Sequence, residues 1–130
     1  MEFIQAIPHP VLVGAVISLG LVIGSFANVC IHRLPLNESV VFPGSHCPAC
    51  SSAVRPLDNI PVISYIILAG KCRDCATRIS PIYPLSEAVT AALLITGFFR
   101  FGLSFDFLVF VVVAPTLGII TAIDIEHQIL

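Results

Sequence analysis

The feature that most constrains the fold is a long stretch without charged side chains near the start of the chain. Residues 3–31 contain no Asp, Glu, Lys or Arg. A helix needs about 20 apolar residues to cross the hydrocarbon core of a bilayer, and this stretch is longer. A cleaved signal peptide is the alternative, but the stretch is too long for one, has no basic group before it and offers no convincing cleavage site. We therefore expect a first transmembrane helix here.

Two shorter apolar segments follow later in the chain. One runs from Ile82 to Phe99 with Glu87 as its only charged residue, and the other covers the uncharged residues 107–123. Both are long enough to span a membrane as helices. In the whole chain 57% of residues are hydrophobic and 11% are charged, whereas about a quarter are charged in soluble domains. The expected fold class is an all-α integral membrane protein with about three transmembrane helices.

The basic residues predict the orientation in the membrane. Five of the six Lys and Arg residues fall between positions 33 and 78. Loops rich in Lys and Arg stay on the cytoplasmic side. We therefore expect residues 32–80 in the cytoplasm, the N-terminus outside, and a third helix that returns inward. No basic stripe with interleaved aromatic residues occurs, so nucleic-acid binding has no support.

Four of the five cysteines form two CxxC pairs within that loop. Cys47 and Cys50 make the first pair, Cys72 and Cys75 the second, and 21 residues separate the pairs. Two such turns can supply four thiolates to one tetrahedral zinc ion, although the separation is slightly longer than the usual range of about 15 to 20 residues. Two disulfides are the alternative, which a reducing cytoplasm disfavours. The loop is therefore expected to be a cytoplasmic zinc-ribbon-like domain.

The segment between the pairs, NIPVISYIILAG (residues 59–70), carries no charge. It is too short to cross a bilayer, so we expect either a buried core segment or an interfacial one. Several prolines interrupt the loop, which predicts an irregular module stabilised by its metal. Cys30 lies alone in the first apolar stretch, where a small buried side chain is the simplest interpretation.

Five motifs occur in order along the chain: GSFANVCIHRLP, SHCPAC, DNIPVISYIILAGKCRDCATRIS, YPLSE and TAIDIEHQIL. Together they closely resemble the N-terminal half of the bacterial type IV prepilin peptidases. The resemblance implies a multi-pass enzyme of the bacterial inner (cytoplasmic) membrane with two activities. One is an aspartic-type endopeptidase that cleaves leader peptides from prepilins and pseudopilins of type IV pilus and type II secretion systems. The other is an N-methyltransferase that uses S-adenosylmethionine.

The resemblance also implies roles for individual residues. It places zinc on the four cysteines of the CxxC pairs and the first catalytic aspartate at Asp124. Aspartic proteolysis needs two carboxylates that share a proton. The family carries the second in a G-x-G-D motif on a later helix, and this sequence has no such motif. We therefore expect the C-terminal half of the peptidase as a partner, and no peptidase turnover by these 130 residues alone.

Asp106 and Glu87 are two other acids of the chain that could be partners of Asp124. Asp106 lies 18 residues earlier, about 27 Å away along a helix, which excludes it. Glu87 is the plausible intramembrane neighbour and matches the acid of the family's YPL-x-E motif, so it is a candidate functional acid. A carboxylate stabilised by the helix N-terminus is the alternative for Glu87, and a solvated end charge is the alternative for Asp124. Asp124 and His127 share a helix face and form a weak two-ligand metal match.

The expected domains are residues 1–31 as the first transmembrane helix, 32–80 as the zinc domain, and 81–130 as the second and third transmembrane helices with Asp124. Three hypotheses describe the chain: a truncated prepilin peptidase and methyltransferase, a stand-alone zinc-containing module without proteolytic activity, or a homodimeric protease in which two Asp124 residues meet. In the family an arginine commonly precedes the tyrosine of YPL, and here Ile82 stands there. No glycine-rich fingerprint identifies residues that contact S-adenosylmethionine.

Overall fold

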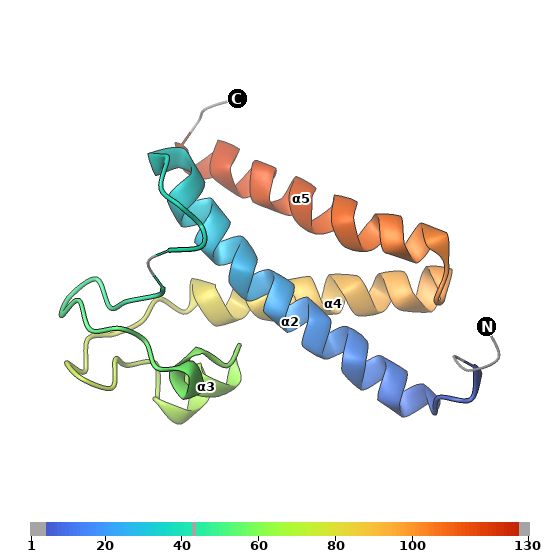
Figure 1. Cartoon of the computed structure of the whole chain (residues 1–130), viewed down its shortest axis with the longest axis horizontal. Coiled ribbons are helices and arrows are strands. Elements are labelled where there is room, and N and C mark those ends of the chain that lie inside the picture. The colour runs from blue at the N-terminus through green and yellow to red at the C-terminus, as the bar shows by residue number, and fades with distance from the viewer. Residues whose placement is uncertain (1–4, 43, 128–130) are drawn as a thin grey trace.

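The computed structural model describes residues 5–42 and 44–127, without the side chain of His127. Three long helices form a bundle, and three short helical elements lie in the loop between the first two of them (Figure 1). The long helices are α2 (His9–Arg33), α4 (Ile82–Phe101) and α5 (Phe105–His127); the short elements are η1 (Leu34–Leu36), η2 (Pro56–Asn59) and α3 (Ile63–Ile67). Among the described residues no β-strand forms, only two isolated bridges. The all-α fold class is confirmed.

Each long helix is long and apolar enough to cross a membrane. The expectation of three candidate spans is therefore confirmed, and the chain is a multi-pass membrane protein. The described part of α2 extends to Arg33, where its guanidinium is buried and donates to the backbone oxygens of Ser39 and Gly44. These bonds tie the chain that leaves α2 to the end of the helix.

The turn between α4 and α5 explains why the two helices run antiparallel. Gly102 ends α4 with a positive φ of 65°, which glycine adopts without the steric cost of a side chain, and its N–H donates to the carbonyl of Phe98. Ser104 then caps α5, because its Oγ accepts the N–H of Phe107 at 3.3 Å. Asp106 in the first turn of α5 suits the positive end of that helix.

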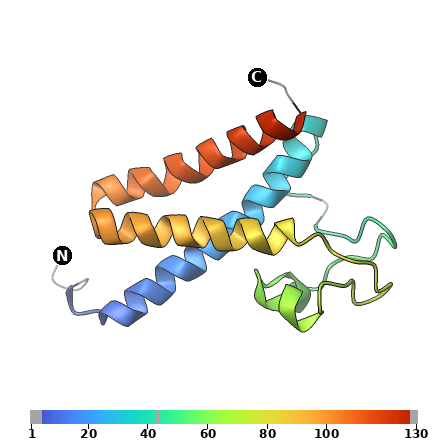
Figure 2. The same ribbon diagram turned by 180° about the vertical axis from the view of Figure 1, so that it is seen from behind.

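The backbones of α2 and α4 approach each other closely where the two helices cross (Figure 2). A Cβ added to Gly20 would lie 2.5 Å from Cα of Ala91, and one added to Gly24 would lie 2.7 Å from Cα of Glu87. Glycines four residues apart share one helix face, and such small residues let membrane helices approach closely. The Gly20-x-x-x-Gly24 spacing is visible in the sequence, but its role in packing was not predicted.

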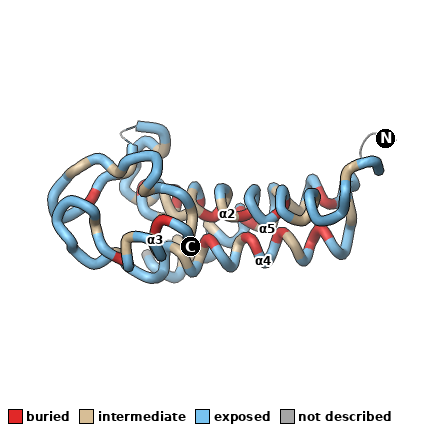
Figure 3. The backbone as a smooth tube through the Cα atoms, turned by 90° about the horizontal axis from the view of Figure 1, so that it is seen from below, coloured by how far each residue is buried: buried red, intermediate tan, exposed pale blue. Residues whose placement is uncertain are grey.

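We call residues 34–81, between α2 and α4, the loop module. The apolar core lies in the half of the bundle away from this module. Val16, Leu94, Phe98 and Phe107 are buried together, and Leu94 is fully enclosed. The rings of Phe98 and Phe107 meet edge to face with centroids 5.8 Å apart, a favourable aromatic arrangement. Figure 3 shows buried segments on the facing sides of the long helices, while the loop between α2 and α4 is mostly exposed.

Candidate functional site

The four cysteines of the CxxC pairs come together in the loop module. Their Sγ atoms all lie within 4.8 Å of one another. Sγ of Cys47 is 3.7 Å from that of Cys75, and Sγ of Cys50 is 3.9 Å from that of Cys72. A tetrahedral ion with bonds of about 2.3 Å would place its sulfurs about 3.8 Å apart. The cysteines are unbridged, so this four-cysteine cluster can hold a metal ion.

Two turns of the same construction present these sulfurs. In the first, the carbonyl of Cys47 accepts the N–H of Ser51, and the N–H of Cys47 donates to Ser52. The second turn repeats both bonds 25 residues later, with Cys72 and Ala76 in the places of Cys47 and Ser51. An isolated bridge closes each turn. The corresponding sequences, SHCPACSSAV and GKCRDCATRI, therefore form an internal structural repeat that the sequence analysis did not identify.

The hydroxyl group after each pair favours the thiolate form of a cysteine. Sγ of Cys75 lies 3.1 Å from Oγ1 of Thr77, and hydrogen bonds to the side chain and backbone of Thr77 lower the pKa of Cys75 to about 6. Hydrogen bonds to Ser52, the equivalent residue of the first turn, lower the pKa of Cys50. Burial and hydrogen bonds to the side chains of Cys47 and Cys75 instead raise the pKa of Cys72 to about 11. Metals bind the thiolate rather than the thiol, so Ser52 and Thr77 favour metal binding at Cys50 and Cys75.

An ion pair joins the second cysteine turn to η2. Arg73 donates from Nε to Oδ2 of Asp58 at 2.8 Å and from Nη2 to Oδ1 at 2.7 Å. Such a two-point contact fixes geometry as well as charge. The Asp58 side chain is 9% exposed. Hydrogen bonds from Arg73 hold the pKa of Asp58 below its ordinary value.

This ion pair predicts a pH-dependent effect of Asp58→Asn. Because the folded-state pKa of Asp58 is lowered, its stabilising contribution is present above the ordinary carboxyl pKa and is lost as pH falls through the lowered value. The variant should unfold its loop module more easily than the parent near pH 7. The difference should shrink as pH falls below the ordinary carboxyl pKa of about 4 and should vanish below the lowered value. Resistance of the loop to protease across this pH range measures it.

Asp74→Asn is the matched control for that comparison. Asp74 pairs with Arg55 at 3.8 Å through one oxygen, and both side chains are considerably exposed. Exposed single contacts contribute little to stability. Equal effects of Asp58→Asn and Asp74→Asn at neutral pH would contradict the special role of the two-point pair.

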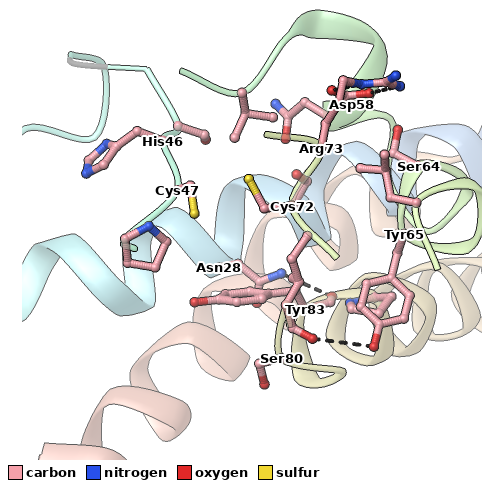
Figure 4. Close-up of a pocket in the computed structure, with 18 of the residues that line it drawn as sticks. Asn28, His46, Cys47, Asp58, Ser64, Tyr65, Cys72, Arg73, Ser80 and Tyr83 are labelled. Carbon is pink, nitrogen blue, oxygen red and sulfur yellow. Dashed lines mark hydrogen bonds and ion pairs between the residues drawn. The ribbon is translucent and has the colours of Figure 1, made fainter. Parts of the chain in front are cut away.

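A cavity of about 650 Å³ separates the cysteine turns from the ends of α2 and α4. Figure 4 shows the side chains that line it, with Cys47 and Cys72 on one side and Tyr65 and Tyr83 on another. Asn28 donates to the carbonyl of Tyr83 at 3.2 Å. The volume is within the range of about 300 to 1,000 Å³ of small-ligand sites, and the lining combines aromatic and polar groups as those sites do.

Glu87 has a structural role that its position in the sequence did not show. It is the sixth residue of α4, beyond the first turn, and its side chain is buried. Its Oε2 accepts the backbone N–H of Val62 at 2.7 Å. Val62 has a φ of 63°, which is unusual for a β-branched residue. Glu87 therefore fastens the loop module to α4, and the alternative of a helix N-terminal carboxylate does not describe this geometry.

Asp124 lies near the end of α5 and is half-buried. Asp106 is in the first turn of the same helix, so the two carboxylates lie at opposite ends of α5. The end of α5 lies beside the end of α2, on the same side of the bundle as the loop module (Figures 1 and 2). The weak metal match with His127 involves a side chain outside those described.

Comparison with known proteins identifies a family and several relatives of this chain. Residues 18–101 match the family model of the bacterial peptidase A24 N-terminal domain, a range that includes the four-cysteine cluster and Glu87 but not Asp124. A prepilin leader peptidase/N-methyltransferase of Myxococcus xanthus is 40% identical over 86% of this chain and 33% of its own length. Proteins of the same name are 38% identical in Bacillus subtilis, over 85% of this chain and 45% of the relative, and in Klebsiella pneumoniae, over 96% and 58%.

The chain thus spans only a part, between a third and three-fifths, of the length of these curated relatives. No solved structure shows a significant match to it. The family-model match covers well over half of the 130 residues. The chain belongs to the bacterial peptidase A24 N-terminal domain family.

Proposed function

We propose that this chain is the N-terminal part of a prepilin leader peptidase and N-methyltransferase. The observation that carries the proposal is the likeness to proteins of that name over 85% to 96% of the chain. The proposed substrates are type IV prepilins or pseudopilins. The proposed location is the bacterial inner membrane, with the N-terminus outside and the loop module in the cytoplasm, where its basic residues favour it.

Asp124 is the proposed first catalytic carboxylate. Asp124 lies near the last residue of α5, on the same side of the bundle as the loop module. This position supports the role, because the substrate's cleavage site and the module would then lie on the same side of the membrane. The second carboxylate comes from a G-x-G-D helix that is not among these 130 residues. One carboxylate acts as base toward a water molecule while the other protonates the scissile carbonyl. Asp106 is too distant to serve as that partner.

Zinc is the proposed ion of the four-cysteine cluster. The set of four thiols and the sulfur separations suit tetrahedral zinc. Its role is structural, because four protein ligands leave no open position for a substrate. When bound, zinc cross-links two turns that have little apolar core of their own. Cys47, Cys50, Cys72 and Cys75 hold it, and the Asp58–Arg73 pair braces the second turn.

S-adenosylmethionine is the proposed methyl donor. The 650 Å³ cavity is the proposed place for it, because its volume and its mixed aromatic and polar lining suit a nucleoside-sized ligand. This cavity opens between the module and the helix ends, close to where a cleaved substrate would leave the membrane.

Prepilin cleavage in membranes tests the peptidase proposal. The chain is expressed alone and together with a C-terminal half that carries the G-x-G-D helix, each with and without Asp124→Asn. Cleavage should require the second half and should fall by about 100-fold to 10,000-fold in Asp124→Asn, the usual contribution of a catalytic acid or base. Asp106→Asn, at the other end of α5, is the matched control and should retain cleavage.

The same experiment separates the alternatives. Cleavage by the chain alone that Asp124→Asn abolishes would replace the proposal with the homodimeric protease. An absence of cleavage in the complemented membranes, with the module intact, would favour the stand-alone module without proteolytic activity. Cleavage that survives Asp124→Asn would exclude Asp124 as the catalytic carboxylate.

A further inference from the structure

The segment between the two cysteine turns exposes a row of large aliphatic side chains. We call Ile60, Ile63, Ile66 and Ile67 the α3 apolar face. Ile66 and Ile67 are 69% and 70% exposed, and no charged residue occurs in residues 59–70. The expectation of a buried core segment is therefore wrong for these side chains. Four exposed isoleucines within eight residues are more than singly scattered surface apolar residues, and such groups of exposed apolar side chains mark interaction sites.

The hydrogen bond between Val62 and Glu87 indicates how deep this segment lies. Glu87 is five residues beyond Ile82, so the bond lies about 7 Å along α4 from its start. The same position of α4 contacts Gly24, which is nine residues, or about 13 Å, before the end of α2. The module is thus anchored well inside the ends of two membrane-spanning helices.

The length of α2 relates that depth to the bilayer. Its 25 residues span about 37 Å, roughly 7 Å more than a hydrocarbon core of about 30 Å. If α2 stands along the membrane normal and all of this excess extends beyond the core on the module side, Gly24 lies about 6 Å inside the hydrocarbon boundary. Val62 is bonded to the side chain of Glu87, whose Cα lies against Gly24. In Figures 1 and 2, α3 lies beside the first turns of α4, at the same level.

The backbone around α3 is suited to a position in lipid. The N–H of Ile60 donates to Oγ of Ser64 at 2.9 Å, and that hydroxyl donates to the carbonyl of Leu57 at 2.7 Å. The N–H of Val62 is held by Glu87 at 2.7 Å. The backbone N–H groups of residues 68–71 donate to carbonyls of residues 64–68. Backbone polar groups in a bilayer must be satisfied within the protein, because no water is available.

Basic side chains follow directly after this segment. Lys71 and Arg78 form an isolated antiparallel bridge, and both are exposed. The charge of Asp58, the nearest preceding acid, is paired with Arg73. Apolar side chains next to exposed basic groups are the pattern of segments that bind the surface of anionic membranes.

We propose that residues 59–70 form an interfacial element that inserts the α3 apolar face among the lipid acyl chains on the module side of the membrane. The partner is the bilayer itself, not another protein. The element is continuous with the membrane-spanning surface of α4, and the Glu87 contact holds it at that depth. It keeps the four-cysteine cluster and the cavity against the membrane surface. This inference requires only that the long helices span a membrane, and it is independent of the proposed enzyme activity.

Single tryptophan residues test the proposal, because the chain contains no tryptophan. Ile66→Trp is reconstituted in bilayers that contain lipids brominated on their acyl chains. Val112→Trp on the exposed side of α5 is the membrane reference, and Ala49→Trp on the first cysteine turn is the aqueous control. Ile66→Trp should emit at shorter wavelength than Ala49→Trp, lose intensity to brominated lipid as Val112→Trp does, and resist acrylamide.

Quenching of Ile66→Trp by acrylamide, as in Ala49→Trp, would overturn the proposal. Protection from both quenchers would also overturn it, since protein would then cover the face. Tryptophan itself favours membrane interfaces, so a second measurement uses the unsubstituted chain. Lipids with a photoreactive group on the acyl chain should label residues 59–70, as mapped by mass spectrometry. Labelling confined to the long helices would contradict the insertion.

Discussion

Replacing Cys72 with serine is expected to reduce bound zinc from about one ion per chain to background. The four sulfurs lie within 4.8 Å of one another, and removal of one leaves a three-thiolate site that water can enter. Structural zinc contributes about 10 to 16 kcal/mol in zinc-finger peptides, and folding of such modules depends on it. We therefore also expect the loop between α2 and α4 to become sensitive to protease. Metal analysis of the purified chain and limited proteolysis measure the two effects.

Cys30→Ala is the matched control for this substitution. Cys30 is buried in α2 and does not belong to the four-cysteine cluster. Its replacement removes a thiol without removing a ligand, so zinc content should not change. A Cys72→Ser protein that keeps one zinc per chain would show that the ion is bound outside the four-cysteine cluster. Equal loss of zinc in both variants would indicate a general folding defect instead of the loss of a ligand.

Gly24→Leu is expected to separate α2 from α4. A Cβ at this position would lie 2.7 Å from the backbone of Glu87, and backbone cannot move aside as a flexible side chain can. Overpacking in a close contact costs about 1 to 3 kcal/mol, and occasionally more. The displaced Glu87 would also lose its bond to Val62, which fastens the loop module. The protein is placed in bicelles and unfolded with rising concentrations of a denaturing detergent. The concentration at the midpoint of unfolding measures the loss of stability.

Gly14→Leu provides the control on the same helix. A Cβ on Gly14 meets no atom within 4 Å, so leucine there should face lipid with little effect on stability. Because both variants replace a glycine of α2 with leucine, the change in helix propensity is the same in both, and a difference in stability between them reports on packing. Similar shifts in both variants would exclude close packing as the function of Gly24.

Several features of the fold could be predicted because they depend on local composition. The three spans were found from uncharged length alone, because a bilayer imposes the same requirement on every helix that crosses it. The cysteine pairs were recognised because two residues between cysteines suit one metal ion. The predicted separation of Asp106 and Asp124 also followed from one continuous helix and its fixed rise.

Two other patterns are visible in the sequence but do not by themselves predict a contact. Gly20 and Gly24 have the spacing of a membrane-helix contact. The cysteine turns repeat after 25 residues, and the residue with the hydroxyl group is at the equivalent position in both turns. Neither pattern says which surface it contacts. The residues that pack against such small residues depend on which helix lies opposite them; here they are Ala91 and Glu87 of α4.

The sequence by itself determined the membrane-spanning helices and the grouping of cysteines, since hydrophobic length and ligand spacing act within short segments. Only the tertiary structure decided that Glu87 holds Val62, that Arg73 holds Asp58, and that the isoleucines of α3 face outward. These contacts join residues 15 to 25 positions apart. Local periodicity carries no information about such pairs, because they form only when folding brings separate parts of the loop module against each other and against α4.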